Sequence, residues 1–82
     1  MRFNVAALAH LVAVQLQVAT TDVTPDARFV DDLGAEPIHI VDMILALEEH
    51  FEIDIASSDA GELRTLRDVL EYLARRGYTA EP

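Results

Sequence analysis

Apolar residues return every three or four positions in several separate segments of the 82-residue chain. Near the start, Leu8, Leu11, Val12 and Leu16 follow this spacing, which predicts an amphipathic helix over residues 3–17. We find no segment that alternates apolar and polar residues as a half-buried strand does. The pattern therefore predicts an all-α domain without β-strands.

A second helix is expected from Pro37 to about Phe51, because proline suits the first helical position, where its missing N–H would have no partner. Its apolar surface is wider than one core contact requires, so part of it is expected to meet another protein. Before this helix, residues 19–36 are polar and form a long loop. Apolar residues are expected to hold the loop on the core: Val23, Phe29, Val30 and Leu33.

The last third of the chain offers two sets of capping residues. Candidate N-caps for a short third helix are Ser57, Ser58 and Asp59. Thr65, with Asp68 three residues later, predicts the capping box of a fourth helix that ends at Gly77. Residues 77–82 are expected to be a frayed tail. Residues 1–82 are therefore expected to form a single domain, a small four-helix bundle with a long first loop.

Composition restricts the partners and the chemistry. The chain has no cysteine, which excludes disulfides and thiolate metal sites. Its net charge is −9, and it has six arginines and no lysine, which argues against nucleic acid and favours partners that carry basic patches. The three histidines do not supply three convergent ligands, so no metal site is expected. We see no catalytic constellation and expect no enzyme activity.

The apolar N-terminal run, residues 1–21, resembles a signal peptide because Arg2 precedes an apolar stretch. His10 and two glutamines interrupt it, no convincing cleavage site follows, and its apolar length is too short to span a bilayer. We therefore expect a cytoplasmic monomer that does not bind membranes.

Three stretches carry a more specific pattern: FVDDLGAE (29–36), VDMILALEEHFEIDI (41–55) and TLRDVLEYL (65–73). The motif Phe-x-x-Asp-Leu-Gly is followed by a leucine-rich helix that ends in Leu-Glu-Glu-x-Phe. In this order, the stretches resemble the acyl carrier proteins of fatty-acid and polyketide synthesis. The resemblance runs from about Val14 to Ala74 and implies the four-helix bundle of that family.

The resemblance also reveals a departure at the attachment position. In that family Asp-Ser-Leu opens the second helix, and the serine carries phosphopantetheine. Here Glu36, Pro37 and Ile38 occupy those positions, and proline has no hydroxyl to attack coenzyme A. We therefore expect no phosphopantetheine on this chain. Ser57 and Ser58 are better explained as caps than as a displaced attachment site.

The resemblance implies that an acidic second helix docks on basic patches of a synthase, a transferase or another protein. No Lys or Arg lies between Arg28 and Arg64, and we expect Ile40 and Met43 to be the exposed apolar centre of the docking surface. The expected partner-binding residues are Glu36, His39, Ile40, Asp42, Met43, Glu48 and Glu49. His39 replaces an acid that is usual in the family. The alternative is an acidic face that serves solubility only.

Two functions stay open. The first is a non-carrier relative of acyl carrier proteins that acts by docking or regulation. The second is a true acyl carrier that binds acyl groups noncovalently between the helices or uses an unusual attachment site.

Overall fold

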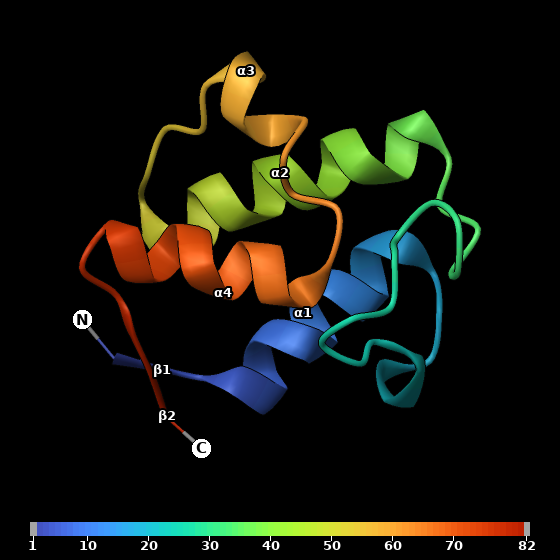
Figure 1. Ribbon diagram of the computed structural model, residues 1–82, viewed down its shortest axis with the longest axis horizontal. Helices are drawn as coiled ribbons and strands as arrows, with labels where there is room; N and C mark the ends of the chain where they lie inside the picture. The colour runs from blue at the N-terminus through green and yellow to red at the C-terminus, as the bar shows by residue number, and fades with distance from the viewer. Residues whose placement is uncertain (1, 82) are drawn as a thin grey trace.

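Four α-helices and one short two-stranded sheet make up the protein (Figure 1). The computed structural model describes residues 2–81. The elements follow in the order β1 (Arg2–Asn4), α1 (Val5–Leu16), the 3-10 helix η1 (Thr20–Asp22), α2 (Pro37–Phe51), α3 (Ser57–Ala60), α4 (Leu66–Arg75) and β2 (Thr79–Glu81). The predicted four-helix architecture is confirmed.

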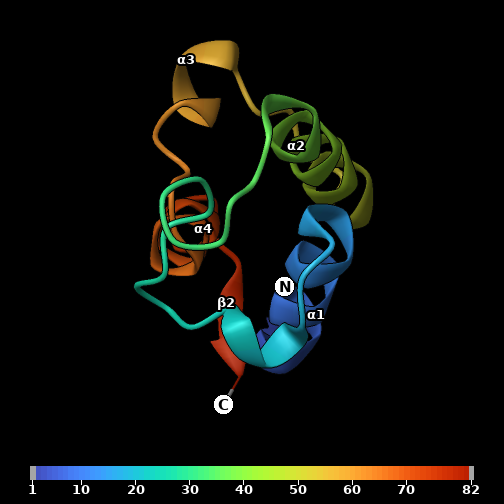
Figure 2. The same ribbon diagram turned by 90° about the vertical axis from the view of Figure 1, so that its right-hand side faces the viewer.

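The core lies where α1, α2 and α4 meet. Figure 2 shows α1 and α2 on one side of the molecule and α4 on the other, with α3 at one end. Each long helix contributes fully buried side chains, and so does the loop before α2; they include Val12, Phe29, Met43, Leu47, Leu66 and Leu73. Burial of these apolar surfaces supplies most of the driving force for folding.

The first helix is shorter than expected at its N-terminal end. The side-chain Oδ1 of Asn4 accepts a hydrogen bond from the N–H of Ala7 at 3.0 Å, so Asn4 is the N-cap and α1 begins at Val5. At the other end, Gln17 adopts a left-handed conformation with φ 59° and closes the helix. The residues before Asn4 belong to β1 instead.

The long loop is held on the core, as expected, although not by all of the expected residues. Val23 and Phe29 are buried, and Leu33 is half-buried. The prediction for Val30 is wrong, since 57% of this residue is exposed. Residues 28–34 form a helix-like turn, in which the Asp32 N–H donates to the Arg28 carbonyl and the Gly34 N–H donates to the Val30 carbonyl. Adjacent side chains in such a turn do not share a face, so Val30 points away from the core that Phe29 enters.

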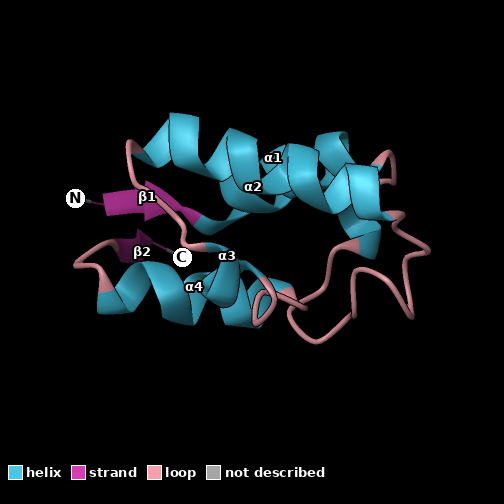
Figure 3. Cartoon of the chain, turned by 90° about the horizontal axis from the view of Figure 1, so that it is seen from above, coloured by secondary structure: helices cyan, strands magenta, loops and turns pink. Residues whose placement is uncertain are grey.

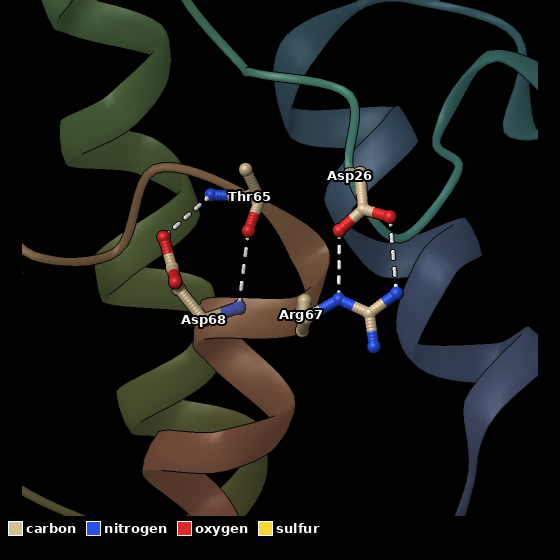
Figure 4. Close-up of polar contacts among 4 residues, drawn as sticks. All are labelled: Asp26, Thr65, Arg67 and Asp68. Atoms are coloured by element: carbon tan, nitrogen blue, oxygen red, sulfur yellow. Dashed lines mark hydrogen bonds and ion pairs between the residues drawn. The ribbon is translucent and has the colours of Figure 1, made fainter.

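Polar contacts also tie the loop to the start of α4 (Figure 4). The Arg67 guanidinium donates two hydrogen bonds to the Asp26 carboxylate, at 2.7 and 3.0 Å, and the Arg67 N–H donates to the Pro25 carbonyl at 3.0 Å. The N–H of Phe29 donates to the Arg64 carbonyl at 2.9 Å. These contacts join segments that lie far apart in the sequence.

The fourth helix begins as its sequence predicts. Thr65 Oγ1 accepts from the Asp68 N–H at 3.1 Å, and the Asp68 carboxylate accepts from the Thr65 N–H at 3.2 Å, which completes the capping box (Figure 4). Gly77, with φ 89°, follows the helix and turns the chain toward β2.

The caps predicted for the third helix are wrong. Ala56 is the N-cap of α3, and its side chain makes no capping hydrogen bond. Asp59 accepts a hydrogen bond from the Tyr72 hydroxyl at 3.2 Å and pairs with Arg76 at 3.9 Å. The Asp59 carboxylate therefore binds side chains that follow in and after α4, instead of capping α3 as the sequence pattern predicts.

The predictions of no strand and of a frayed tail are also wrong within residues 2–81. Strands β1 and β2 pair in parallel, with Arg2 opposite Thr79 and Asn4 opposite Glu81 (Figure 3). Each strand has three residues, too few to produce a recognisable alternation. The aromatic ring of Phe51, at the end of α2, contacts Phe3 of β1 and Tyr78, the residue before β2. Pro82 lies outside the described residues.

Phe51 contacts aromatic rings from both ends of the chain. Its ring packs edge-on against Phe3 and against Tyr78, each with centroids 5.3 Å apart. The Tyr78 hydroxyl donates to the Phe51 carbonyl at 2.6 Å and so satisfies one acceptor at the C-terminal end of α2. These contacts hold the tail in place.

Candidate docking surface and attachment position

The start of α2 is a glycine turn that leads directly into the helix. Gly34 has φ 70°, a conformation that glycine adopts without strain, and Ala35 is buried behind it. Glu36 is the N-cap and Pro37 is the first helical residue, as the sequence predicts. The N–H of Glu36 donates to His39 Nδ1 at 3.1 Å, so the half-buried His39 ring helps to close the first turn.

No residue close in sequence to this turn has a hydroxyl or thiol side chain. From Pro25 to Ala56 the sequence contains no Ser, Thr, Tyr or Cys. The flanking hydroxyl residues are Thr24, in the loop after η1, and Ser57, at the start of α3.

Three apolar side chains of α2 point to solvent: Ile38, Val41 and Leu45. They are 64%, 55% and 57% exposed, respectively. Their spacing of three and four residues places them on one side of the helix. We call these three residues the apolar stripe. A contiguous exposed apolar surface of this kind marks an interaction site more often than scattered single residues do.

The predicted apolar centre of the docking surface was partly misplaced. Met43 is fully buried, with no exposed surface, so the prediction that it contacts a partner is wrong. Met43 lies four residues before Leu47 and eight before Phe51, and these three residues form the buried side of the helix. Ile40 is half-buried beside them.

The acidic residues predicted to surround the centre lie in two settings. Glu36, Asp42 and Glu49 are exposed on α2 or at its N-cap. Glu48 is half-buried, and its Oε2 accepts a hydrogen bond from the Ile55 N–H at 2.9 Å. Glu48 therefore also closes the turn after α2. The sequence predicts surplus apolar surface on α2, but the exposed part of that surface is the apolar stripe rather than the expected Ile40 and Met43.

A pocket of about 290 Å³ opens between the loop, α2 and the segment that joins α3 to α4. The lining residues are Arg28, Phe29, Val30, Asp31, Ile40, Ala60, Gly61, Leu63 and Arg64. Phe29 and Leu63 are buried, so the inner wall is apolar, while both arginines are exposed. No local sequence pattern predicts this pocket, because its walls come from the loop, α2, the end of α3 and the segment after it.

No group of three or more His, Asp and Glu side chains within residues 2–81 is arranged to hold a metal ion. Over the same residues, no helix has the length and apolar character needed to cross a membrane.

Comparison with known proteins identifies the family. Residues 6–73 match the family described as "Phosphopantetheine attachment site". The acyl carrier protein of Syntrophobacter fumaroxidans is 41% identical over 68 residues, which cover 83% of this chain and 84% of that protein. This chain belongs to the acyl carrier protein family. The acyl carrier protein of Bdellovibrio bacteriovorus is 40% identical over 67 residues, which cover 82% of this chain and 86% of that protein.

Membership of the acyl carrier protein family confirms the resemblance drawn from the three sequence stretches. Acyl carrier proteins are non-enzymatic, which agrees with the expectation that this chain is not an enzyme. The family description names a phosphopantetheine attachment site, whereas α2 of this chain begins with Pro37.

Proposed function

We propose that this chain is a docking module of fatty-acid or polyketide synthesis that carries no phosphopantetheine. The observation that carries the proposal is Pro37 as the first residue of α2, within a stretch from Pro25 to Ala56 that lacks every hydroxyl and thiol side chain. The resemblance to acyl carrier proteins aligns Pro37 with the serine that bears the cofactor.

The residues at this turn do not fit the covalent attachment of phosphopantetheine. Transfer of the arm needs an oxygen nucleophile that attacks the pyrophosphate of coenzyme A. Proline offers neither a hydroxyl nor a backbone N–H. Thr24 and Ser57 are the flanking hydroxyl residues, and they belong to other parts of the fold. Helix α2 therefore begins at the expected position, but its first residue lacks the hydroxyl group that the attachment reaction requires.

The docking role rests on the apolar stripe and on the acids beside it. Protein interfaces commonly place an apolar centre inside a polar rim. The exposed Glu36, Asp42 and Glu49 give this rim a negative charge, and no Lys or Arg lies between Arg28 and Arg64 to neutralise it. A partner with a basic patch around an apolar hollow would complement this surface and would be steered toward it.

The mass of the intact protein tests the absence of covalent loading. Incubated with coenzyme A and a promiscuous phosphopantetheinyl transferase, the wild-type chain is expected to gain no mass. The Pro37→Ser variant is expected to gain one phosphopantetheine, because the Gly34 turn and the helix start are retained. Losing proline destabilises the fold by only about 0.4–1 kcal/mol.

A modified wild-type chain would contradict the non-carrier proposal directly. If only the serine variant is modified, the missing hydroxyl alone accounts for the difference. A variant that stays unmodified would show that His39 or Glu36 also prevents recognition by the transferase.

A pair of valines tests the docking surface. Val41, in the apolar stripe, and Val14, on α1, are both 55% exposed. Val41→Glu is expected to weaken binding to purified synthase or transferase enzymes by more than about 1 kcal/mol, as for a central interface residue. Val14→Glu introduces the same charge at equal exposure and is expected to leave binding unchanged. Equal losses for both variants would assign the effect to total charge and would contradict the proposed surface.

A second candidate function is a true acyl carrier that binds acyl groups noncovalently. The family match favours it, since the family is described by the attachment of an acyl-bearing arm. The pocket of about 290 Å³ supports it, because Phe29, Ile40 and Leu63 line it with apolar surface. Lipid extraction and native mass spectrometry of the purified protein test this candidate.

A further inference from the structure

Arg64 differs from the other five arginines of the chain in its contacts. Within residues 2–81, the others pair with an acid or stack on an aromatic ring: Arg2 with Glu81, Arg28 with Asp31, Arg67 with Asp26, Arg76 with Asp59, and Arg75 over Tyr72. No hydrogen bond or ion pair of the Arg64 guanidinium occurs within the described residues. Within the described residues, Arg64 is therefore the arginine whose guanidinium has neither an acid nor an aromatic ring as a partner.

The backbone of Arg64 is fixed at the pocket between the loop and α2. Its carbonyl accepts from the N–H of Phe29 at 2.9 Å, and its own N–H donates to the Asp68 carboxylate at 3.0 Å. Phe29 and Arg64 both line the pocket. The Arg64 backbone is therefore held at the pocket wall by hydrogen bonds, while the guanidinium at the end of the side chain has no hydrogen-bond or ion-pair partner within the described residues.

The rim of the pocket is more basic than the rest of this region. Arg28 and Arg64 line it together with one acid, Asp31, which already pairs with Arg28 at 3.2 Å. The deeper wall is apolar and includes Phe29 and Leu63. An apolar wall beneath an unpaired cation fits a ligand with an apolar chain and a single anionic head.

We propose that this pocket binds the free anion of a medium-chain carboxylic acid, with its carboxylate at Arg64 and its chain against Phe29, Ile40 and Leu63. The inference rests on the second candidate function above and names its ligand class. A guanidinium binds a carboxylate through two parallel hydrogen bonds, whereas an ester or thioester carries no charge for it. Because the start of α2 offers no hydroxyl for attachment, the ligand keeps its free acid.

Two series of ligands test the apolar contact and the charge interaction separately: one varies the chain length and the other varies the head group. Each added methylene that reaches the apolar wall is expected to tighten binding about fourfold until the pocket is full. Removing the charge of the head group is expected to weaken binding about tenfold. Hexanoate, octanoate and decanoate test the first effect, and octanol and methyl octanoate test the second.

The decisive experiment is a titration of the full chain, at neutral pH, followed by nuclear magnetic resonance and by calorimetry. Octanoate is expected to bind about tenfold more tightly than octanol and to shift the amide signals of Val30 and Ile40. Arg64→Gln is expected to reduce octanoate affinity to that of octanol while octanol affinity stays unchanged. Arg75→Gln makes the same change of charge away from the pocket and is expected to have no effect.

Three results would overturn the inference. Equal affinity of the wild-type chain for octanoate and octanol would remove the role of the cation. Equal losses in Arg64→Gln and Arg75→Gln would show that only the overall charge matters. Binding of none of these compounds would overturn the inference and the noncovalent carrier together. The docking proposal would stand in each case, because the mass measurement and the two valine variants test it separately.

Discussion

A single ion pair shows how individual residues stabilise the long loop. Arg67 and Asp26 form two hydrogen bonds between exposed side chains, across a sequence separation of 41 residues. The hydrogen bond from Arg67 holds the pKa of Asp26 below its ordinary value of 3.8, and the same bond raises the pKa of Arg67. Exposed pairs of this kind contribute little each, so the geometry matters more for positioning the loop than for total stability.

We expect Asp26→Asn to lower the melting temperature slightly at neutral pH and to have a progressively smaller effect as the pH falls below the ordinary pKa of the carboxyl group. The pKa of Asp26 is lower in the folded chain than in the unfolded chain. The stabilisation is therefore complete above 3.8 and is lost as the pH falls through the folded value. Thermal unfolding of the wild-type chain and of Asp26→Asn, from neutral to acidic pH, measures the difference in melting temperature.

Asp22→Asn is the control for that measurement. Asp22 is exposed in η1, and its side chain makes no ion pair within residues 2–81. A difference between Asp26→Asn and the wild-type chain that persists in acid would argue against the pair as its cause.

At the scale of elements, α3 and α4 are held by different means. Helix α4 starts with a complete capping box from its own sequence, through Thr65 and Asp68. The four-residue α3 has no side-chain cap and contacts α4 through Asp59, which accepts from the Tyr72 hydroxyl. A helix as short as α3 is not stable by itself, so its position depends on the elements around it.

The two helix starts can be compared by one substitution each. Thr65→Ala is expected to reduce the free energy of unfolding by about 1 kcal/mol, because the Asp68 N–H loses its acceptor. Ser57→Ala, at the start of α3, is expected to change it by less than about 0.5 kcal/mol. Denaturant titrations of both variants give these values. A large effect of Ser57→Ala would show a capping role that the hydrogen bonds do not indicate.

At the scale of the whole molecule, charge is distributed unevenly. The segment between Arg28 and Arg64, which includes α2 and α3, contains no Lys or Arg, whereas four of the six arginines lie from Arg64 to Arg76. The molecule measures 30 × 28 × 19 Å, and salt screens charges over about 8 Å at physiological ionic strength. A partner at α2 therefore meets the local acidic surface rather than the average charge of the protein.

The sequence alone determined the features that depend on neighbouring residues. Pro37 set the start of α2 because its ring suits the first helical position, and Thr65 with Asp68 set the start of α4. The motifs of the acyl carrier protein family and the lack of a hydroxyl residue close to Pro37 in the chain can likewise be read from the sequence alone.

The tertiary structure decided which side of each element is covered. Periodicity indicates only that α2 has a wide apolar surface, to which both Met43 and Val41 belong; packing against the other helices buries Met43 and leaves Val41 exposed. The β1–β2 pairing and the pocket beside Arg64 likewise join segments that are distant in the sequence. Such contacts depend on where the elements meet in space, and no local pattern of residues records that.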